Sequence, residues 1–182
     1  MSFNPLCIIP ECYVDTNLIA YLVNNNVNHQ HCCSKVVGTL KGKFKDRFAV
    51  GIIDRDKDEV GYLSECEEII SSTHLCIWKH RSLPHFLITI RPAIDGFLLD
   101  CAQEQGVSPE TFGLPSELED FINRTKKITS NIDPALRRLI EAIRENGEIV
   151  ALKKILQYLL ENTYHSKNEE IKAFFPCSVN SI

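Results

Sequence analysis

Short apolar runs that alternate with helical patterns constrain the fold of this chain more than any other feature. Residues 6–10 (LCIIP) and 48–54 (FAVGIID) are apolar at successive positions, as in strands that are covered on both faces. Residues 16–22 (TNLIAYL) carry apolar side chains at helical spacing, and Asp15 or Thr16 is a suitable N-cap. Strands and helices joined by short connections favour an α/β fold, with a parallel sheet flanked by helices.

The same periodicities assign the rest of the chain. Further strands are predicted at 31–37, 74–79 and 85–90, the last two as a hairpin. Helical elements are predicted at 39–47 (a short basic helix or loop), 59–71, 115–125, 133–145 and 147–163, with Ser116 and Asp133 as cap candidates. After Pro92 the period is helical, and the tail from His165 is expected to pack loosely. We therefore expect an α/β core at 1–90 and a helical C-terminal region at 91–182.

Charge and composition limit the function classes. The net charge of −4 is not that of a protein that coats nucleic acid without specificity, because such proteins are normally basic. A metal-dependent nuclease remains compatible with it, since bound cations reverse the sign of an acidic site. Hydrophobic residues make up 44% of the 182 residues, enough for a core that needs no disulfides.

The cysteines and the apolar runs indicate a compartment. The N-terminus lacks the basic and apolar regions of a signal peptide, and most of the eight cysteines lie in apolar runs. We therefore expect free thiols and a cytoplasmic protein. No apolar run approaches the roughly 18 residues of a membrane-spanning helix, so no membrane partner is expected.

Acidic residues follow two of the predicted strands. Glu11 ends the first strand, and Asp54 ends the strand at 48–54, with Asp56 two residues further on. The carboxyl ends of parallel strands meet at one edge of a sheet, where sites form. Gathering carboxylates there is costly unless a cation is present, and Mg²⁺ prefers oxygen ligands. Residues i and i+2 of an extended segment point the same way, so both aspartates can face one Mg²⁺ or Mn²⁺ ion.

The stretches IIPECYVDTNLIAYL and FAVGIIDRDKD resemble the TOPRIM domain of topoisomerases, bacterial primases, RecR-type repair proteins and OLD-family nucleases. The resemblance covers about residues 6–80. It implies a nuclease or related phosphoryl-transfer protein acting on DNA or RNA. Glu11 would be a metal ligand or general acid/base, Asp54 and Asp56 would bind Mg²⁺, and Asp15 would be a supporting acid or further ligand. The family's glycine after the glutamate is replaced by Cys12 here.

The resemblance also suggests accessory groups and a partner. The region after the core is similar to OLD-like phage-defence proteins, with Asp95 as an accessory acid and Lys79 as a residue that steadies a phosphate. The basic residues at 41–47 either follow a phosphate backbone or form a solvated face. RecR-type proteins keep this fold without catalysis, so a binding or scaffold protein is the alternative function. Because the chain has no P-loop, a partner such as an ATPase would be encoded elsewhere.

Other interpretations compete for single residues. Zinc binding is one interpretation of the crowded run His29, His31, Cys32 and Cys33, with His74 or His80 supplying further ligands. Cys12 could be a nucleophile. The aspartates at 54 and 56 could simply cap a turn, Asp15 could cap a helix, and the arginines at 137, 138 and 144 fit a solvated surface.

Overall fold

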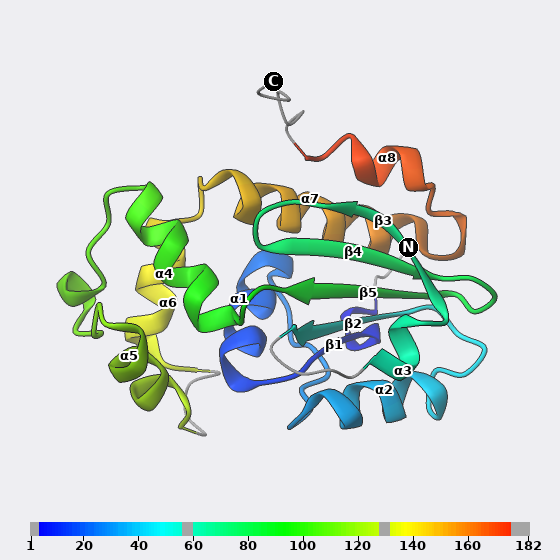
Figure 1. The fold of residues 1–182 in the computed structure, drawn as a ribbon, viewed down its shortest axis with the longest axis horizontal. Helices are drawn as coiled ribbons and strands as arrows, with labels where there is room; N and C mark the ends of the chain where they lie inside the picture. The colour runs from blue at the N-terminus through cyan, green and yellow to red at the C-terminus, as the bar shows by residue number, and fades with distance from the viewer. Residues whose placement is uncertain (1–3, 56–59, 128–131, 176–182) are drawn as a thin grey trace.

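A five-stranded sheet forms the centre of the computed structural model, which describes residues 4–55, 60–127 and 132–175 (Figure 1). Its strand order is β1-β2-β5-β4-β3. The strands are β1 (Ile8–Pro10), β2 (Ala49–Asp54), β3 (Cys66–Ser71), β4 (Leu75–His80) and β5 (His85–Ile90). β1, β2 and β5 are parallel, whereas β4 is antiparallel to β5 and β3 to β4. The α/β class and the β4–β5 hairpin are confirmed, but the sheet is mixed because that hairpin reverses the chain.

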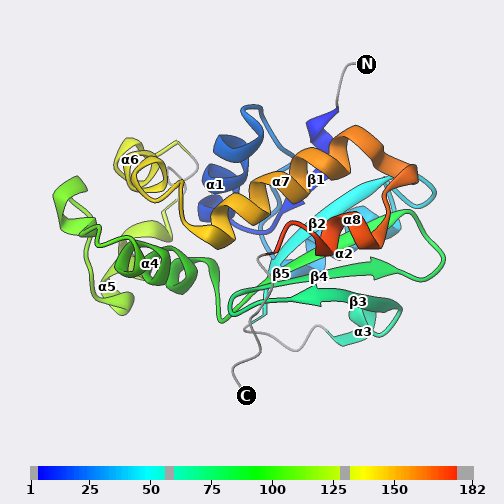
Figure 2. The same cartoon turned by 90° about the horizontal axis from the view of Figure 1, so that it is seen from above.

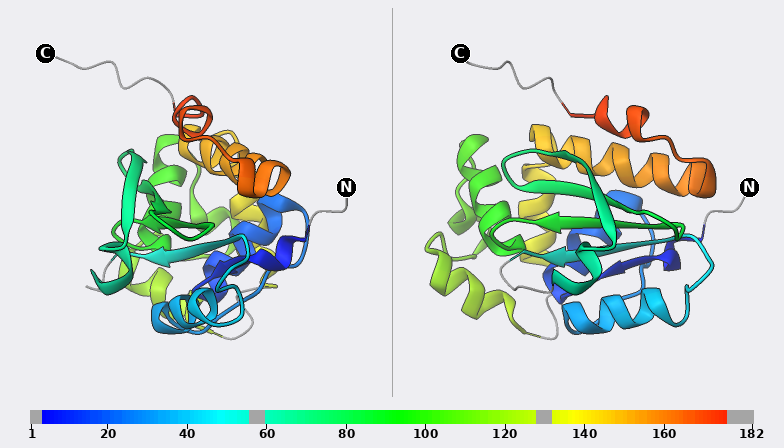
Figure 3. Two further views of the ribbon diagram at one scale, coloured as in Figure 1. Left: turned by 90° about the vertical axis from the view of Figure 1, so that its right-hand side faces the viewer. Right: turned by 45° about the vertical axis from the view of Figure 1, so that its right-hand side comes forward.

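Helices cover both faces of the sheet and one of its ends. They are α1 (Tyr13–Val23), α2 (Cys33–Lys41), α3 (Val60–Leu63), α4 (Ile94–Glu104), α5 (Leu118–Thr125), α6 (Pro134–Ala142), α7 (Gly147–Asn162) and α8 (Asn168–Lys172). α2 and α7 lie on opposite sides of the sheet (Figure 3), and α7 crosses above it (Figure 2). α4, α5 and α6 group at the end toward which β2 and β5 point (Figure 1). The carboxyl ends of the parallel strands therefore face this helical group.

The predicted strand at 31–37 is wrong, because this segment begins α2. Cys33, Val36 and Leu40 are buried at helical spacing, while Ser34 and Lys35 between them are exposed. The apolar pairs in HCCSKVV fit a short strand and a helix equally well, and packing on β2 decides between them. The extended segment at 27–30 runs beside β1 instead, with backbone hydrogen bonds from Asn28 to Ile8 (3.0 Å) and from Gln30 to Pro10 (2.9 Å).

The predicted helix at 59–71 is also wrong over most of its length. Of the residues described in this segment, which begin at 60, Val60–Leu63 is helical and Cys66–Ser71 forms β3. β3 pairs with β4 through an irregular register between Glu68 and Ile70. Cross-strand pairing thus outweighs the local helical pattern, as expected when tertiary contacts override propensity.

The helical pattern after Pro92 is confirmed. Asp133 caps α6, with its carboxylate accepting from Ala135 N (2.9 Å), whereas Glu117 rather than Ser116 precedes α5. The part of the tail that the structure describes packs firmly, contrary to expectation, because Ile171 of α8 is fully buried.

The described cysteines are all free thiols, as predicted. None of the helices in the described residues is both long and apolar enough to span a membrane.

Gly51 provides a test of how closely α2 packs on β2. A Cβ at this position would lie 2.8 Å from Leu87 Cδ2 and 3.0 Å from Val36 Cγ1, both of them buried. We expect Gly51→Ala to lower the free energy of unfolding by about 1–2 kcal/mol through overpacking. In urea unfolding, the matched control Gly38→Ala should instead raise the free energy of unfolding, by up to about 1 kcal/mol. A Cβ at this position on α2 meets open space, and alanine has the higher helix propensity. A stabilised Gly51→Ala variant would contradict this packing.

Candidate functional site

The ends of β1 and β2 bring two of the predicted acids into contact. Glu11 follows β1 directly, and its Oε2 accepts a hydrogen bond from the backbone N–H of Asp54, the last residue of β2, at 3.1 Å. Glu11 is only 6% exposed, so its carboxylate is held rather than free in solvent. The parallel register, with Pro10 opposite Ile52, explains why residues 43 positions apart meet here.

Asp54 also connects the sheet to the helix that follows β5. Its Oδ1 accepts from the backbone N–H of Ile94 at 2.9 Å, at the first residue of α4. A carboxylate at a helix N-terminus satisfies an otherwise unpaired donor and complements the helix dipole. Asp56 lies outside the described residues, so the structure does not place it.

A cavity of about 440 Å³ opens beside these acids. Its lining combines carboxylates, imidazoles and a cation, contributed by Glu11, Asp54, Asp95, His29, His31 and Lys126. Asp95 lies in the first turn of α4 and accepts a hydrogen bond from Thr125 Oγ1 of α5 at 2.6 Å. Burial raises the pKa of Asp95, although the bond from Thr125 and the charge of Lys126 oppose this shift.

Asp15 serves as a capping residue of α1. It is the third residue of the helix, and its Oδ2 accepts from the backbone N–H of Cys12 at 3.1 Å in a capping box. The side chain is fully buried, and its Oδ1 has no hydrogen-bond partner. Burial raises the pKa of Asp15 to about 7, with the charges of Glu11 and Asp95 acting in the same direction. Asp15 therefore caps α1, but it does so from the third helical residue, while Cys12 occupies the N-cap position.

Cys12 does not have the environment of a nucleophile. It is the N-cap of α1, and its Sγ accepts from the backbone N–H of Asp15 at 3.4 Å. Burial raises the pKa of its thiol well above the ordinary value, and the charges of Asp15 and Asp54 raise it further. The thiolate is the reactive form of cysteine, so the site disfavours the proposed nucleophile.

Differential alkylation tests this conclusion. Cys32 has a lowered pKa, chiefly through a hydrogen bond with Ser34. With limiting iodoacetamide at pH 7.5, we expect Cys32 to be modified at least about 10-fold faster than Cys12, because reactivity follows the thiolate fraction. Peptide mass spectrometry over time gives both rates. Faster modification of Cys12 would contradict the assigned environment.

The two histidines of the cavity wall form an aromatic cluster with Tyr13. His29 stacks on Tyr13 with ring centroids 4.2 Å apart, and His31 meets His29 edge-on at 4.9 Å. Thr16 Oγ1 donates to the carbonyl of Cys12 (2.7 Å), so His29 Nδ1 donates to Thr16 and its Nε2 is the unprotonated nitrogen. Burial and the neighbouring His31 lower the pKa of His29.

The zinc interpretation finds no support in the described residues, where no three His, Cys, Asp or Glu side chains are grouped so as to hold a metal ion. His74 bonds Glu148 and Asp100, and His80 bonds Glu65, so neither joins His29 and His31. A cation bound at Glu11 and Asp54 would therefore have fewer than three protein ligands unless Asp56 also binds it.

The two groups predicted to contact phosphate lie at the opposite strand ends from the acids. They are Lys79 and the basic residues at 41–47. Lys79 is near the end of β4, and because β4 is antiparallel to β5 it lies opposite Phe86 rather than near Ile90 and Asp54. The basic residues at 41–47 precede β2, whereas the acids follow it. Lys41 is paired with Glu65 at 3.1 Å. The interpretation of this stretch as a solvated face therefore fits the structure better.

The roles of Lys126 and Thr125 were not predicted from the sequence, and His29 and His31 were considered only as zinc ligands. Lys126 lies directly after α5 and reaches the cavity because α5 packs against α4. No local pattern links these positions to Glu11, since they meet only through helix packing.

Comparisons of the chain with protein-family models, with curated proteins and with solved structures found no match. The fold and the site therefore define an α/β protein with a partly buried acidic cavity at the carboxyl edge of its parallel strands.

Proposed function

We propose that this chain is a TOPRIM-like, divalent-cation-dependent phosphoryl-transfer enzyme, a nuclease that acts on DNA or RNA through Glu11, Asp54 and Asp56. The observation that carries the proposal is the contact between the Glu11 carboxylate and the end of β2, beside a cavity with a third acid, Asp95. The order of the motifs, Glu-x-x-x-Asp after one strand and Asp-x-Asp after another, supports the same class.

The donor set suits Mg²⁺ or Mn²⁺. Mg²⁺ binds oxygen ligands and is commonly held by one or two carboxylates together with water and phosphate. Glu11 and Asp54 supply carboxylates next to the cavity, and Asp56 would supply the third. When bound, the cation would neutralise charge on the phosphoryl group and orient the attacking oxygen.

The chain's own residues would then position the substrate. Lys126 places a positive charge on the cavity wall, which attracts a phosphate toward the acids. Glu11 and Asp54 are each fixed by a backbone N–H, so little reorganisation is needed when a ligand binds.

A second candidate function is a binding or scaffold protein that works with a partner such as an ATPase. One observation favours it. Glu11 and Asp54 each accept a backbone N–H bond that links elements of the fold, and Asp15 accepts one that caps α1. Such bonds give the carboxylates a structural purpose that needs neither metal nor turnover.

A cleavage assay separates the two candidates. We expect the purified protein to cut an end-labelled oligonucleotide in MgCl₂ or MnCl₂ but not in EDTA, and Asp54→Ala/Asp56→Ala to show no cleavage. The matched control Asp46→Ala removes an exposed acid before β2, at the far edge of the sheet, and should retain full activity. Equal cleavage by the wild type and the double variant would trace the activity to a contaminant and refute the enzyme proposal.

A further inference from the structure

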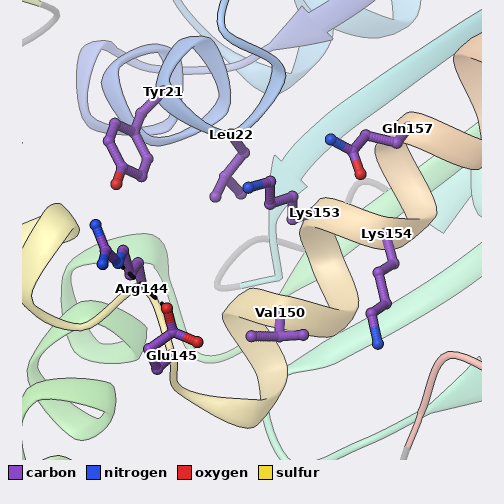
Figure 4. Close-up of a pocket in the computed structure, with 8 residues that line it drawn as sticks. All are labelled: Tyr21, Leu22, Arg144, Glu145, Val150, Lys153, Lys154 and Gln157. Atoms are coloured by element: carbon purple, nitrogen blue, oxygen red, sulfur yellow. Dashed lines mark hydrogen bonds and ion pairs between the residues drawn. The ribbon is translucent and has the colours of Figure 1, made fainter.

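A cleft lies at the opposite end of α1 from the acidic cavity. It has a volume of about 510 Å³ and is bordered by the last turns of α1, the α6–α7 turn and one side of α7 (Figure 4). Tyr21 and Leu22 come from α1, and Arg144 and Lys153 reach toward them from the other elements (Figure 4). We call this hollow the basic cleft.

Positive charge is concentrated in the basic cleft. An adjoining hollow of about 330 Å³ shares Tyr21 and Lys153 with it and adds Arg137. The Arg137 guanidinium lies over the Tyr21 ring, 5.1 Å from its centroid. Glu145 is the acid on this wall, and it already pairs with Arg144 at 3.2 Å. On a chain of net charge −4, such a local excess of cations favours an anionic ligand.

The other groups of the cleft narrow the class of anion. Gln157 contributes a side-chain amide to the cleft, Asn24 contributes one to the adjoining hollow, and Tyr21 contributes an aromatic ring to both. Cations for phosphates, an aromatic ring for a base and amides for base edges are the combination found in single-strand binding grooves. An acidic peptide would use the cations but not the amides, and one face of the Tyr21 ring is already covered by Arg137.

We propose that the basic cleft binds the phosphate backbone of a single-stranded nucleic acid. This inference rests on the proposed nuclease function. α1 connects the two sites, because Cys12 and Tyr13 line the acidic cavity and Tyr21 lines the basic cleft. The 11 residues of α1 span roughly 16 Å at 1.5 Å per residue. A stacked strand with about 3.4 Å between phosphates covers that distance in about five nucleotides. Residues 14–19 of α1 are buried, so a strand that reaches both sites would pass over the neighbouring elements and would need more nucleotides than this.

Fluorescence anisotropy tests the inference without any cleavage. A labelled 12-nucleotide oligo-dT is titrated with protein in EDTA at low salt. We expect Arg144→Glu/Lys153→Glu to raise the Kd at least about 10-fold and to reduce the slope of log K against log salt by about 2. The matched control Arg138→Glu/Lys167→Glu carries the same charge change at exposed positions outside the cleft, and should bind like the wild type.

The variants also separate this inference from the proposed function. Lys153→Glu alone, with an unchanged melting temperature, should still raise the Kd about 3-fold or more, which guards against misfolding of the double variant. Asp54→Ala/Asp56→Ala should bind oligo-dT normally while cleaving nothing. Equal affinity of the cleft and control variants would overturn the inference even if cleavage is found. Stronger binding of poly-glutamate than of oligo-dT would overturn it in favour of a protein partner.

Discussion

Glu11→Gln is expected to reduce metal-dependent cleavage at least about 100-fold while leaving the protein folded. A glutamine oxygen can still accept the hydrogen bond from Asp54 N, so the link between β1 and β2 survives. The charge that would hold the cation is lost, and the removal of one electrostatic contact to a reacting phosphoryl group costs roughly 10²–10³ in rate. Initial rates of cleavage at saturating Mg²⁺, together with melting temperatures, give both quantities.

Glu11→Ala provides the complementary case. It removes the acceptor as well as the charge, so the partly buried N–H of Asp54 loses its bond with the Glu11 carboxylate, which costs about 1–3 kcal/mol. We expect this variant to lose both activity and several degrees of thermal stability. If the Glu11→Gln variant cleaves at the same rate as the wild type, Glu11 has a structural role alone and the scaffold alternative is favoured.

The second large effect concerns a polar junction between β4, α4 and α7. Glu148, in the first turn of α7, bonds the imidazole of His74 and the hydroxyl of Ser72, and His74 also meets Asp100 of α4 at 3.0 Å. The Glu148 and His74 side chains are 17% and 8% exposed. Glu148→Ala removes an acceptor from the buried His74 imidazole, which keeps its bond with Asp100. We therefore expect the free energy of unfolding to fall by roughly 2–4 kcal/mol. In urea unfolding, Glu145→Ala, which breaks a solvent-exposed pair on the same turn, should cost less than about 0.5 kcal/mol.

The same junction predicts how stability changes with pH. Burial alone would lower the pKa of His74, but its bonds with Glu148 and Asp100 outweigh this and raise it above 6.5. Burial alone would raise the pKa of Glu148, but its bonds from Ser72 and His74 hold it below 4.5. The pair therefore stabilises the fold fully between about pH 4.5 and 6.5. Its contribution is lost as the pH rises through the folded pKa of His74 or falls through that of Glu148.

Unfolding of the wild type and Glu148→Gln across pH 4 to 9 checks these signs. The difference in stability between the two proteins should be largest near pH 5.5 and should shrink toward pH 9. A difference that grows above pH 7 would mean that His74 is neutral in the folded protein throughout this range.

The meeting of Glu11 with the end of β2 could be predicted from the sequence, because parallel strands place their carboxyl ends at one edge. The apolar runs before each acid were sufficient to define β1 and β2. Two elements were misassigned because their patterns are short. HCCSKVV fits both periods, and Cys66–Ser71, within the predicted helix at 59–71, is a strand because it pairs with β4.

The walls of the cavity could not be predicted in the same way. His29 and His31 are placed by an extended segment that pairs with β1 without a strand pattern of its own. Lys126 arrives from a helix more than 70 residues after Asp54, through packing that no local periodicity encodes. The arginine and lysine of the basic cleft resemble ordinary solvated residues until α1 and α7 are placed side by side.

The most direct test of the account is the position of a bound cation. Anomalous scattering from crystals grown with MnCl₂ locates Mn²⁺ independently of any activity. We expect a peak in contact with the carboxylate oxygens of Glu11 and Asp54, and its loss in Asp54→Ala/Asp56→Ala crystals. Well-diffracting crystals with no peak at these carboxylates, or with Mn²⁺ bound only elsewhere, would contradict it.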